Sequence, residues 1–282
     1  MRIQKDRIET QKFITFSLYI IPLSIILGLF IVKYRDQTTK NTVFPDRTEI
    51  QVIAHRAGAA LAPENTLAAL ECAIQIGADI AEVDVQMTKD GVVVAMHDDS
   101  LERTTDLCCC VWEANWATVR QADAGSWYSV NYAGEKIPTL EELLLAAKGR
   151  IQLMIEIKCT GHEQGVVEKV VPMIQSAGME QECTIGCADI SLLRLSKTLA
   201  PELETVYIGA VADLDLYALD YVDRYSLPIK TLTNESVARA KSEGKKIYTW
   251  TIDTEEEIRT ALNCGVDGFV TDNPPLAMEL LQ

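Results

Sequence analysis

The stretch that decides the fold is Ile80–Asp98, with the sequence IAEVDVQMTKDGVVVAMHD. Two apolar runs within it, Ile80–Val85 and Val92–Met96, lie on either side of a segment that contains Lys89-Asp90-Gly91. Asp-Gly between β-branched runs is typical of a hairpin turn. The stretch therefore predicts two short strands joined by a tight turn.

Two carboxylates and a histidine lie in the same stretch. Glu82 and Asp84 are two residues apart, so both side chains leave the same face of a strand. Ionised carboxylates are almost never fully buried unless they are paired or bind a metal. The second apolar run is followed directly by His97. We therefore expect this hairpin to carry part of a functional site.

Patterns typical of strands and helices alternate over the rest of the chain. The segments Ala73–Asp79 and Ala261–Asp267 share one pattern, in which a helix end, a Gly and an Asp precede a buried strand. The other predicted strands are Ile50–Ala54, Arg150–Ile157, Cys183–Cys187, Glu204–Ile208, Tyr221–Asp223, Lys246–Ile252 and Gly268–Thr271. The predicted helices are one that begins after Asn65-Thr66, then Glu163–Ala177, Ile190–Leu199, Asn234–Glu243, Glu255–Asn263 and Pro275–Leu281.

Roughly eight strands that alternate with helices predict an α/β fold, a TIM (β/α)8 barrel. A doubly wound open sheet is the alternative, but no GxGxxG motif follows a strand. Residues 98–138 break the alternation and are rich in tryptophan and tyrosine. Long segments without periodicity usually have a function. We expect an inserted lid or small subdomain after strand 2, at the catalytic mouth.

The N-terminal part of the chain predicts a membrane anchor. Residues 1–12 are polar, residues 13–32 carry no charge, and residues 33–50 form a linker to a barrel domain at 51–282. An uncharged run of that length spans a bilayer as a transmembrane helix. A signal peptide is the alternative, but no small-residue cleavage site follows. We predict a single-pass protein of the cell membrane. Basic residues flank the span almost equally, and we place the catalytic domain on the extracytoplasmic side.

Composition limits the classes of partner. The 282-residue chain has a net charge of −15, which argues against a nucleic-acid binder and would repel an anionic substrate. Such a substrate would need local cations or a metal. The eight cysteines include no CxxC motif, so a zinc site is not expected.

Titratable residues recur at the predicted carboxyl ends of the strands, where the active site of a TIM barrel lies. Three carboxylates offer the hard oxygen ligands that Mg²⁺ or Ca²⁺ prefer, and two histidines suit acid–base chemistry near neutral pH. Any one of them could be a structural ion pair, but together they favour a site. The candidates are Glu82, Asp84 and Glu156 for a metal, His55 and His97 for proton transfer, Arg56 and Lys158 as cations, and Trp250 as core or pocket lining.

A series of motifs resembles the glycerophosphodiester phosphodiesterase family, from about Val52 to the C-terminus. The N-terminal motifs are His55-Arg56, Pro63-Glu64-Asn65-Thr66, Gly77-Ala78-Asp79-x-x-Glu82-x-Asp84, Thr88-Lys89-Asp90-Gly91, His97-Asp98 and Glu102-Arg103-Thr104-Thr105. The later ones are Ile137-Pro138-Thr139-Leu140, Glu156-Ile157-Lys158, Trp250-Thr251 and Gly265-Val266-Asp267-Gly268 with Thr271-Asp272-x-Pro274. With its predicted anchor, the chain resembles a membrane-anchored bacterial-type member.

The resemblance implies a TIM barrel with a segment inserted after the second strand, and metal-dependent hydrolysis of glycerophosphodiesters to sn-glycerol 3-phosphate and an alcohol. It implies that the three carboxylates hold the divalent cation, Mg²⁺ or Ca²⁺, and that the two histidines act as acid and base. Arg56 would bind phosphate and Lys158 would assist at the phosphoryl oxygens. The nucleophile would be the glycerol 2-hydroxyl or water.

The chain departs from the family pattern in two places. Ala57 stands where the family commonly has Gly, and Asp106-Leu107 followed by three cysteines replaces a Gly-containing loop. Two other functions stay open. A phosphodiesterase acting on lysophospholipids or phospholipid head groups would need an apolar groove, built for example from Trp112, Trp116 and Trp127. A non-catalytic membrane-bound barrel would have no need of all five site residues.

Overall fold

The computed structural model describes residues 50–210 and 214–281. The polar segment 1–12, the predicted span 13–32 and nearly all of the linker 33–50 lie outside the described residues. Within the described ranges, none of the helices combines the length and the apolar character that crossing a bilayer requires.

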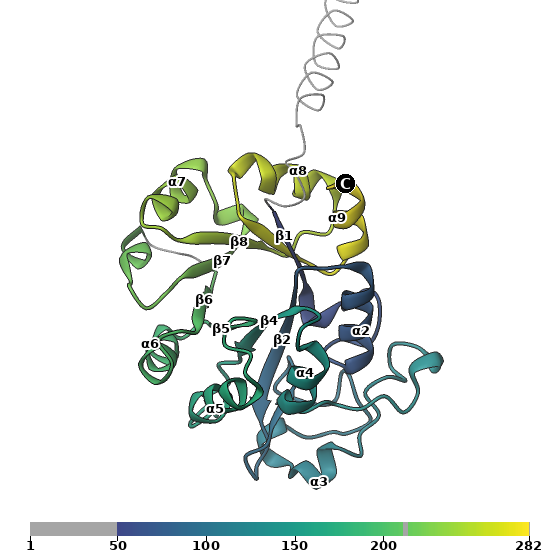
Figure 1. Cartoon of the computed structure of the whole chain (residues 1–282). Helices are drawn as coiled ribbons and strands as arrows, with labels where there is room; N and C mark the ends of the chain where they lie inside the picture. The colour runs from purple at the N-terminus through teal and green to yellow at the C-terminus, as the bar shows by residue number, and fades with distance from the viewer. Residues whose placement is uncertain (1–49, 211–213, 282) are drawn as a thin grey trace, which may run out of the picture. The chain divides into compact units, whose positions relative to one another are not determined.

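Eight parallel strands form a closed barrel in the described part of the chain (Figure 1). Each strand pairs with the next parallel strand along the chain, and the first pairs with both the second and the last. The strands are β1 (Gln51–Ala54), β2 (Ile80–Met87), β4 (Gln152–Ile157), β5 (Cys183–Cys187), β6 (Glu204–Ile208), β7 (Arg224–Pro228), β8 (Lys246–Trp250) and β9 (Gly268–Thr271). The TIM barrel is confirmed, and the open sheet is excluded by the β1–β2 pairing.

Helices cover the outside of the barrel between the strands (Figure 1). They bury apolar side chains such as Leu143, Val170 and Ile258 against the outward face of the sheet. The helices are α2 (Leu67–Ile76), α4 (Leu140–Ala147), α5 (Val167–Ala177), α6 (Ile190–Leu199), α7 (Asn234–Ser242), α8 (Glu255–Cys264) and α9 (Pro274–Leu280). Between β6 and β7 lies a short 3-10 helix, η5 (Leu214–Ala218), and η6 (Ile229–Thr231) follows β7.

The sequence pattern shared by two segments has a structural role. Gly77 and Gly265 end α2 and α8 in the left-handed conformation, each with φ 75°, which favours glycine. The aspartate two residues later accepts a backbone N–H of the neighbouring strand: Asp79 from Val52 at 2.7 Å and Asp267 from Ile247 at 2.8 Å. Each unit therefore ends a helix and fixes the start of a strand pair.

The hairpin at Ile80–Asp98 is present. β3 (Val93–Ala95) runs antiparallel to β2, with Val85 opposite Ala95. After it, residues 98–138 contain η3 (Val111–Glu113), α3 (Trp116–Val119) and η4 (Val130–Tyr132). This segment has a small apolar core of its own, which includes Leu101, Val119 and Ile137. It lies beside α2 and α4, outside the barrel wall (Figure 1).

One predicted strand was misplaced, and one helix was missed. The strand predicted at Tyr221–Asp223 lies at Arg224–Pro228, because Arg224 and Ser226 are polar residues of a buried strand and hide its apolar pattern. Arg224 is neutralised in place by hydrogen bonds to Glu204 and Tyr248. Helix α4 was not predicted, although Thr139 and Glu142 form a capping box that begins it.

Candidate active site

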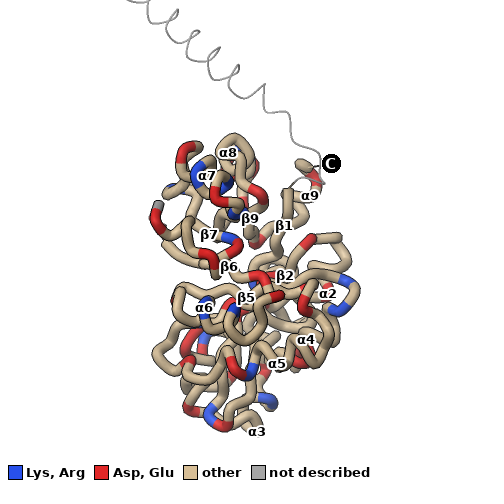
Figure 2. Tube along the Cα trace, turned by 60° about the vertical axis from the view of Figure 1, so that its left-hand side comes forward, with Lys and Arg blue, Asp and Glu red and all other residues tan. Residues whose placement is uncertain are grey.

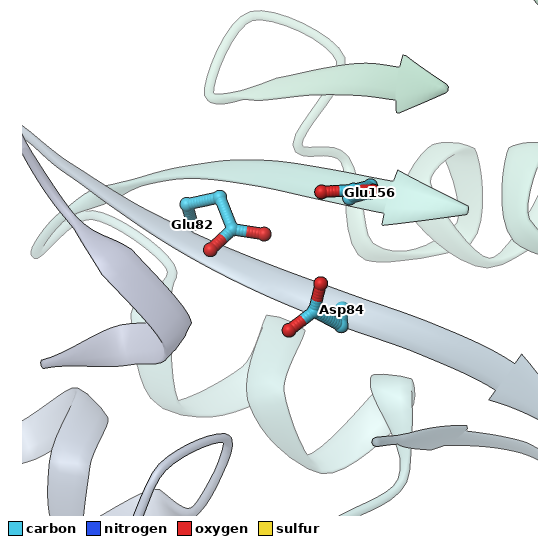
Figure 3. Close-up of side chains that lie close together, drawn as sticks. All are labelled: Glu82, Asp84 and Glu156. Carbon is cyan, nitrogen blue, oxygen red and sulfur yellow. The ribbon is translucent and has the colours of Figure 1, made fainter. Parts of the chain in front are cut away.

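Three carboxylates converge from two neighbouring strands of the barrel (Figure 3). Glu82 and Asp84 lie on β2 and Glu156 lies on β4, with Asp84 and Glu156 paired in the sheet register. Each offers one oxygen, and the three oxygens lie within 4.8 Å of one another. Glu82 and Asp84 are almost fully buried. These are the three residues that we expected from the sequence to hold a cation.

The cluster is electrostatically strained without a counter-charge. Burial, followed by the nearby charge of Asp84, raises the pKa of Glu82 to about 8. Burial and Asp84 also raise the pKa of Glu156. Burial opposes ionisation of Asp84 too, but Lys158, His97 and a hydrogen bond from Asn65 together lower its pKa. Glu82 Oε1 is buried and accepts no hydrogen bond from the residues that the structure describes.

Lys158 supplies one positive charge to the cluster. Its ammonium lies 2.8 Å from Glu156 Oε1 and 3.3 Å from Asp84 Oδ1. Burial works against the charged amine, but the two carboxylates outweigh it and raise the pKa of Lys158. One ammonium against three carboxylates leaves the cluster with the capacity for a divalent cation.

Each of the two histidines is held by an aspartate. His55 follows β1, and its Nδ1 lies 2.7 Å from Asp272 Oδ1, at the end of β9. His97 follows β3, and its Nδ1 lies 2.7 Å from Asp98 Oδ1. Because the pKa values of both aspartates are lowered, the carboxylates are ionised and only accept hydrogen bonds. Nδ1 therefore carries a proton in both rings, which leaves Nε2 to exchange protons with a ligand.

Burial lowers the pKa of His55, but the hydrogen bond to Asp272 and the charge of Glu82 outweigh burial, so the net pKa is raised. Asp272 was not among the residues predicted for the site. Asp272 directly follows a buried strand, as His55 does. This position could have indicated a site residue, because strand ends meet at one face of the barrel. What the sequence lacked was the pairing, since 217 residues separate the two side chains.

Arg56 lies in an unusual backbone segment. Arg56 and Ala57 have φ values of 48° and 63°, in the left-handed region that favours glycine. This conformation aims the Arg56 backbone N–H at Glu82 Oε2, at 2.8 Å. The Ala57 substitution noted in the sequence thus lies where a positive φ is needed, and the chain adopts it with alanine.

A chain of ion pairs links Arg56 to His97. Glu64 accepts a hydrogen bond from Arg56 at 2.9 Å and two from Arg103, at 2.7 and 2.9 Å. Arg103 also donates to both oxygens of Asp98, at 2.6 and 3.0 Å, and Asp98 holds His97. Arg103 comes from the inserted segment. It lies in one of the family motifs, but the sequence predicted no role for it. Arg103 is 39 residues from Glu64, so spacing alone could not reveal this link.

These side chains line a cavity of about 380 Å³. Its charged and titratable lining includes His55, Arg56, Glu82, His97, Glu156 and Lys158. Its apolar lining includes Met154, Ile208, Val270 and Trp250, whose indole N–H donates to the Ser226 carbonyl. Trp250 therefore lines the pocket. Trp112, Trp116 and Trp127 are not part of this lining, so the apolar side of the cavity comes from the barrel strands rather than from the inserted segment.

Positive and negative positions are mixed along the described part of the chain. In the view of Figure 2, Lys and Arg positions are scattered among Asp and Glu positions along the described chain. An anionic ligand in the cavity would therefore depend on Arg56, Lys158 and any bound cation. Cations and proton-transfer groups around one cavity suit a reaction at a phosphate ester.

Comparisons with known proteins agree with this geometry. The sequence model of the glycerophosphoryl diester phosphodiesterase family matches residues 55–276. A glycerophosphodiester phosphodiesterase of Caldanaerobacter subterraneus is 33% identical over 244 residues, which cover 82% of this chain and 97% of that protein. One of Bacillus subtilis is 29% identical, covering 92% and 95%. The structure of an Oleispira antarctica phosphodiesterase in complex with the product sn-glycerol-3-phosphate is similar, with a TM-score of 0.75, 30% identity and coverage of 82% and 96%.

Proposed function

Since the chain belongs to the glycerophosphoryl diester phosphodiesterase family, we propose that it hydrolyses glycerophosphodiesters to sn-glycerol 3-phosphate and an alcohol, with a divalent cation and two histidines. The chain is an enzyme of the phosphodiesterase class. One observation carries the finer proposal: two aspartate-held histidines line the same cavity as Glu82 and Glu156, which belong to the cluster of three carboxylates.

The residues present fit a divalent cation. The donor set is entirely carboxylate oxygen, which Mg²⁺ and Ca²⁺ prefer. Among the described residues, the buried Glu82 Oε1 has no hydrogen-bond partner, and a buried carboxylate oxygen without a partner is unfavourable unless a cation neutralises it. Glu82, Asp84 and Glu156 would hold the ion, which when bound would neutralise charge on the phosphoryl oxygens.

The chain's own groups supply the proton transfers. With Nδ1 protonated and bound by an aspartate, each imidazole presents Nε2 as the exchanging nitrogen. One histidine accepts a proton from the nucleophile, and the other donates a proton to the oxygen of the departing alcohol. Asp272 and Asp98 hold the rings in orientation. The contact with Asp272 also favours the charged form of His55.

Two cations orient the phosphate. Arg56 lines the cavity with its guanidinium held by Glu64, and Lys158 lines the same cavity with its ammonium against Glu156. A substrate phosphate in the cavity would gain charge-assisted hydrogen bonds from these two groups. They supply positive charge locally in a chain whose net charge is −15.

The test is release of sn-glycerol 3-phosphate from glycerophosphocholine by the full chain, with Mg²⁺, with Ca²⁺ and with a chelator. We expect release with at least one metal and none with chelator. A Glu82→Gln variant should be inactive. A Glu279→Gln variant, which removes an exposed charge on α9, should match the wild type. Release that is unaffected by chelator or by Glu82→Gln would refute the metal assignment.

The same assay tests the alternative substrate class. Lysophosphatidylcholine carries the same phosphodiester with an added acyl chain, and the apolar side of the cavity could contact that chain. Choline release from lysophosphatidylcholine without activity on glycerophosphocholine would establish the lipid as substrate. Folded protein without activity on either compound would contradict the proposed function.

We propose, from the uncharged run 13–32 alone, that the enzyme is anchored in the cell membrane with its barrel on the extracytoplasmic side. The test is fractionation of cells, followed by protease treatment of intact cells. Recovery of the full-length chain in the soluble fraction would contradict the anchor, and protection from protease would contradict the orientation.

A further inference from the structure

Two cysteines face each other beside the proposed active site. Cys187 is the last residue of β5, opposite Ile157 of β4, and Cys159 follows Lys158 in the loop after β4. Their sulfur atoms are 3.4 Å apart. No step of the proposed hydrolysis uses either thiol.

The two thiols have opposite environments. Cys187 is fully buried, its thiol lies 3.3 Å from the Ile157 carbonyl, and its sulfur accepts the backbone N–H of Asp189 at 3.4 Å. Cys159 is exposed. The hydrogen bond with Cys187 lowers the pKa of the Cys159 thiol to about 7. The same hydrogen bond, together with burial, raises the pKa of the Cys187 thiol. An exposed thiolate with a buried thiol behind it is the arrangement of a redox-active pair.

We propose that Cys159 and Cys187 form a dithiol site that a peroxide oxidises to an intrachain disulfide. The Cys159 thiolate attacks one peroxide oxygen, so an S–O bond forms, the O–O bond breaks and hydroxide leaves. The Cys187 sulfur then attacks the Cys159 sulfur, so the S–S bond forms and the S–O bond breaks. The departing hydroxide takes the Cys187 proton. In total, two thiols lose two electrons to hydrogen peroxide, and two waters form.

The disulfide acts on the site through Lys158. Bond formation brings the sulfurs from 3.4 Å to about 2.05 Å. Cys187 is fixed in a buried strand, so Cys159 must move, and Lys158 is the adjacent residue. The other end of this loop is also held, because His162 stacks on Trp112 of the inserted segment at 4.2 Å. Displacement of Lys158 from its contacts with Asp84 and Glu156 should lower kcat/KM by about 10- to 100-fold. This effect on activity rests on the proposed function.

The chain offers a clear assignment by mass spectrometry. The full chain is treated with one equivalent of hydrogen peroxide, alkylated and digested with trypsin. Cleavage after Lys158, Lys169 and Arg194 places Cys159 in one peptide and Cys183 with Cys187 in the next. We expect a cross-linked pair that has lost two hydrogens, with fragment ions that place the bridge at Cys187. A thiol reductant should reverse both the cross-link and the loss of kcat/KM.

Matched variants decide between this pair and general oxidation. Cys159→Ser, at an exposed position, should abolish the cross-link and the sensitivity of kcat/KM to peroxide, whereas Cys108→Ser, also exposed, should leave both unchanged. Cys159 recovered unbridged, or bridged to the cysteines at 108–110, would overturn the dithiol site. A Cys159–Cys187 bridge with unchanged kcat/KM would overturn the coupling through Lys158. Should the reduced enzyme be inactive, the proposed function fails, while the cross-link result still decides the dithiol site.

Discussion

Replacement of Asp272 by asparagine tests how His55 is held. The Asp272 carboxylate accepts a hydrogen bond from His55 Nδ1 at 2.7 Å. The backbone N–H of Asp272 donates to the Asp253 carboxylate, also at 2.7 Å. The substitution should leave the loop in place, because the contact with Asp253 does not use the side chain. The new amide can turn its NH₂ towards Nδ1, which moves the imidazole proton to Nε2 and leaves no free base.

The expected loss follows from this one contact. Mutating a residue that hydrogen-bonds a functional histidine usually lowers activity by about 10- to 100-fold, and a substitution that inverts the tautomer of the ring lowers it more. We expect kcat/KM for Asp272→Asn to fall by about 100-fold or more, which is about 2.7 kcal/mol of transition-state stabilisation. Stability should change little, because 42% of the Asp272 side chain is exposed and exposed ion pairs contribute little.

The pH profile separates positioning from general electrostatics. The Asp272 contact raises the pKa of His55, so its removal lowers that pKa and should shift the corresponding limb of the kcat/KM profile to lower pH. Asp99→Asn is the matched control, because it removes the charge of an exposed aspartate in the segment after β3, whereas His55 is bound by Asp272. An unshifted profile with kcat/KM within threefold of the wild type would refute the reasoning, as would an equal loss in Asp99→Asn.

Three further predictions concern the cation and the ion-pair chain. Without metal, the free energy of unfolding should fall as pH rises through about 8. Folding raises the pKa of Glu82 from 4.5 to about 8, so ionisation of this carboxyl favours the unfolded chain. Denaturant titrations at several pH values measure this slope, and Glu82→Gln should flatten it. Mg²⁺ or Ca²⁺ at 100 times its Kd should raise the unfolding free energy by about 2.7 kcal/mol in the wild type, and thermal unfolding of Glu82→Gln with and without metal should show no such gain. Arg103→Ala should lower kcat/KM by about tenfold, because Asp98 and Glu64 lose their shared partner. Arg103→Lys should recover part of the lost kcat/KM. Equal activity of the two variants in steady-state assays would count against the bidentate contacts.

Local patterns were sufficient to predict the architecture and one face of the site. The hairpin at Ile80–Asp98 and the alternation of strands and helices predicted the barrel, because a strand's period and a helix's period are properties of adjacent residues. The same reasoning placed His55, Glu82, Asp84 and Glu156 together. In the structure His55, Glu82 and Glu156 line one cavity, and Asp84 lies in the same carboxylate cluster.

Contacts between distant residues could not be predicted in this way. Periodicity states which face of a strand a side chain occupies, but it does not state which side chain lies opposite. The Asp272 partner of His55 and the Glu64 partner of Arg103 come from distant segments. The predicted position of strand β7 was wrong for a related reason. Arg224 can be buried in β7 because Glu204 and Tyr248 on the neighbouring strands hydrogen-bond it.

The contact between His55 and Asp272 joins the first and the last strand of the barrel, β1 and β9. During synthesis on the ribosome, His55 emerges long before its aspartate. Chains that have not yet exposed the last strand lack one of the two strands that pair with β1 and also lack the group that orients His55. Hydrolytic activity should therefore appear only after the barrel closes, which makes the onset of activity a direct reporter of completed folding.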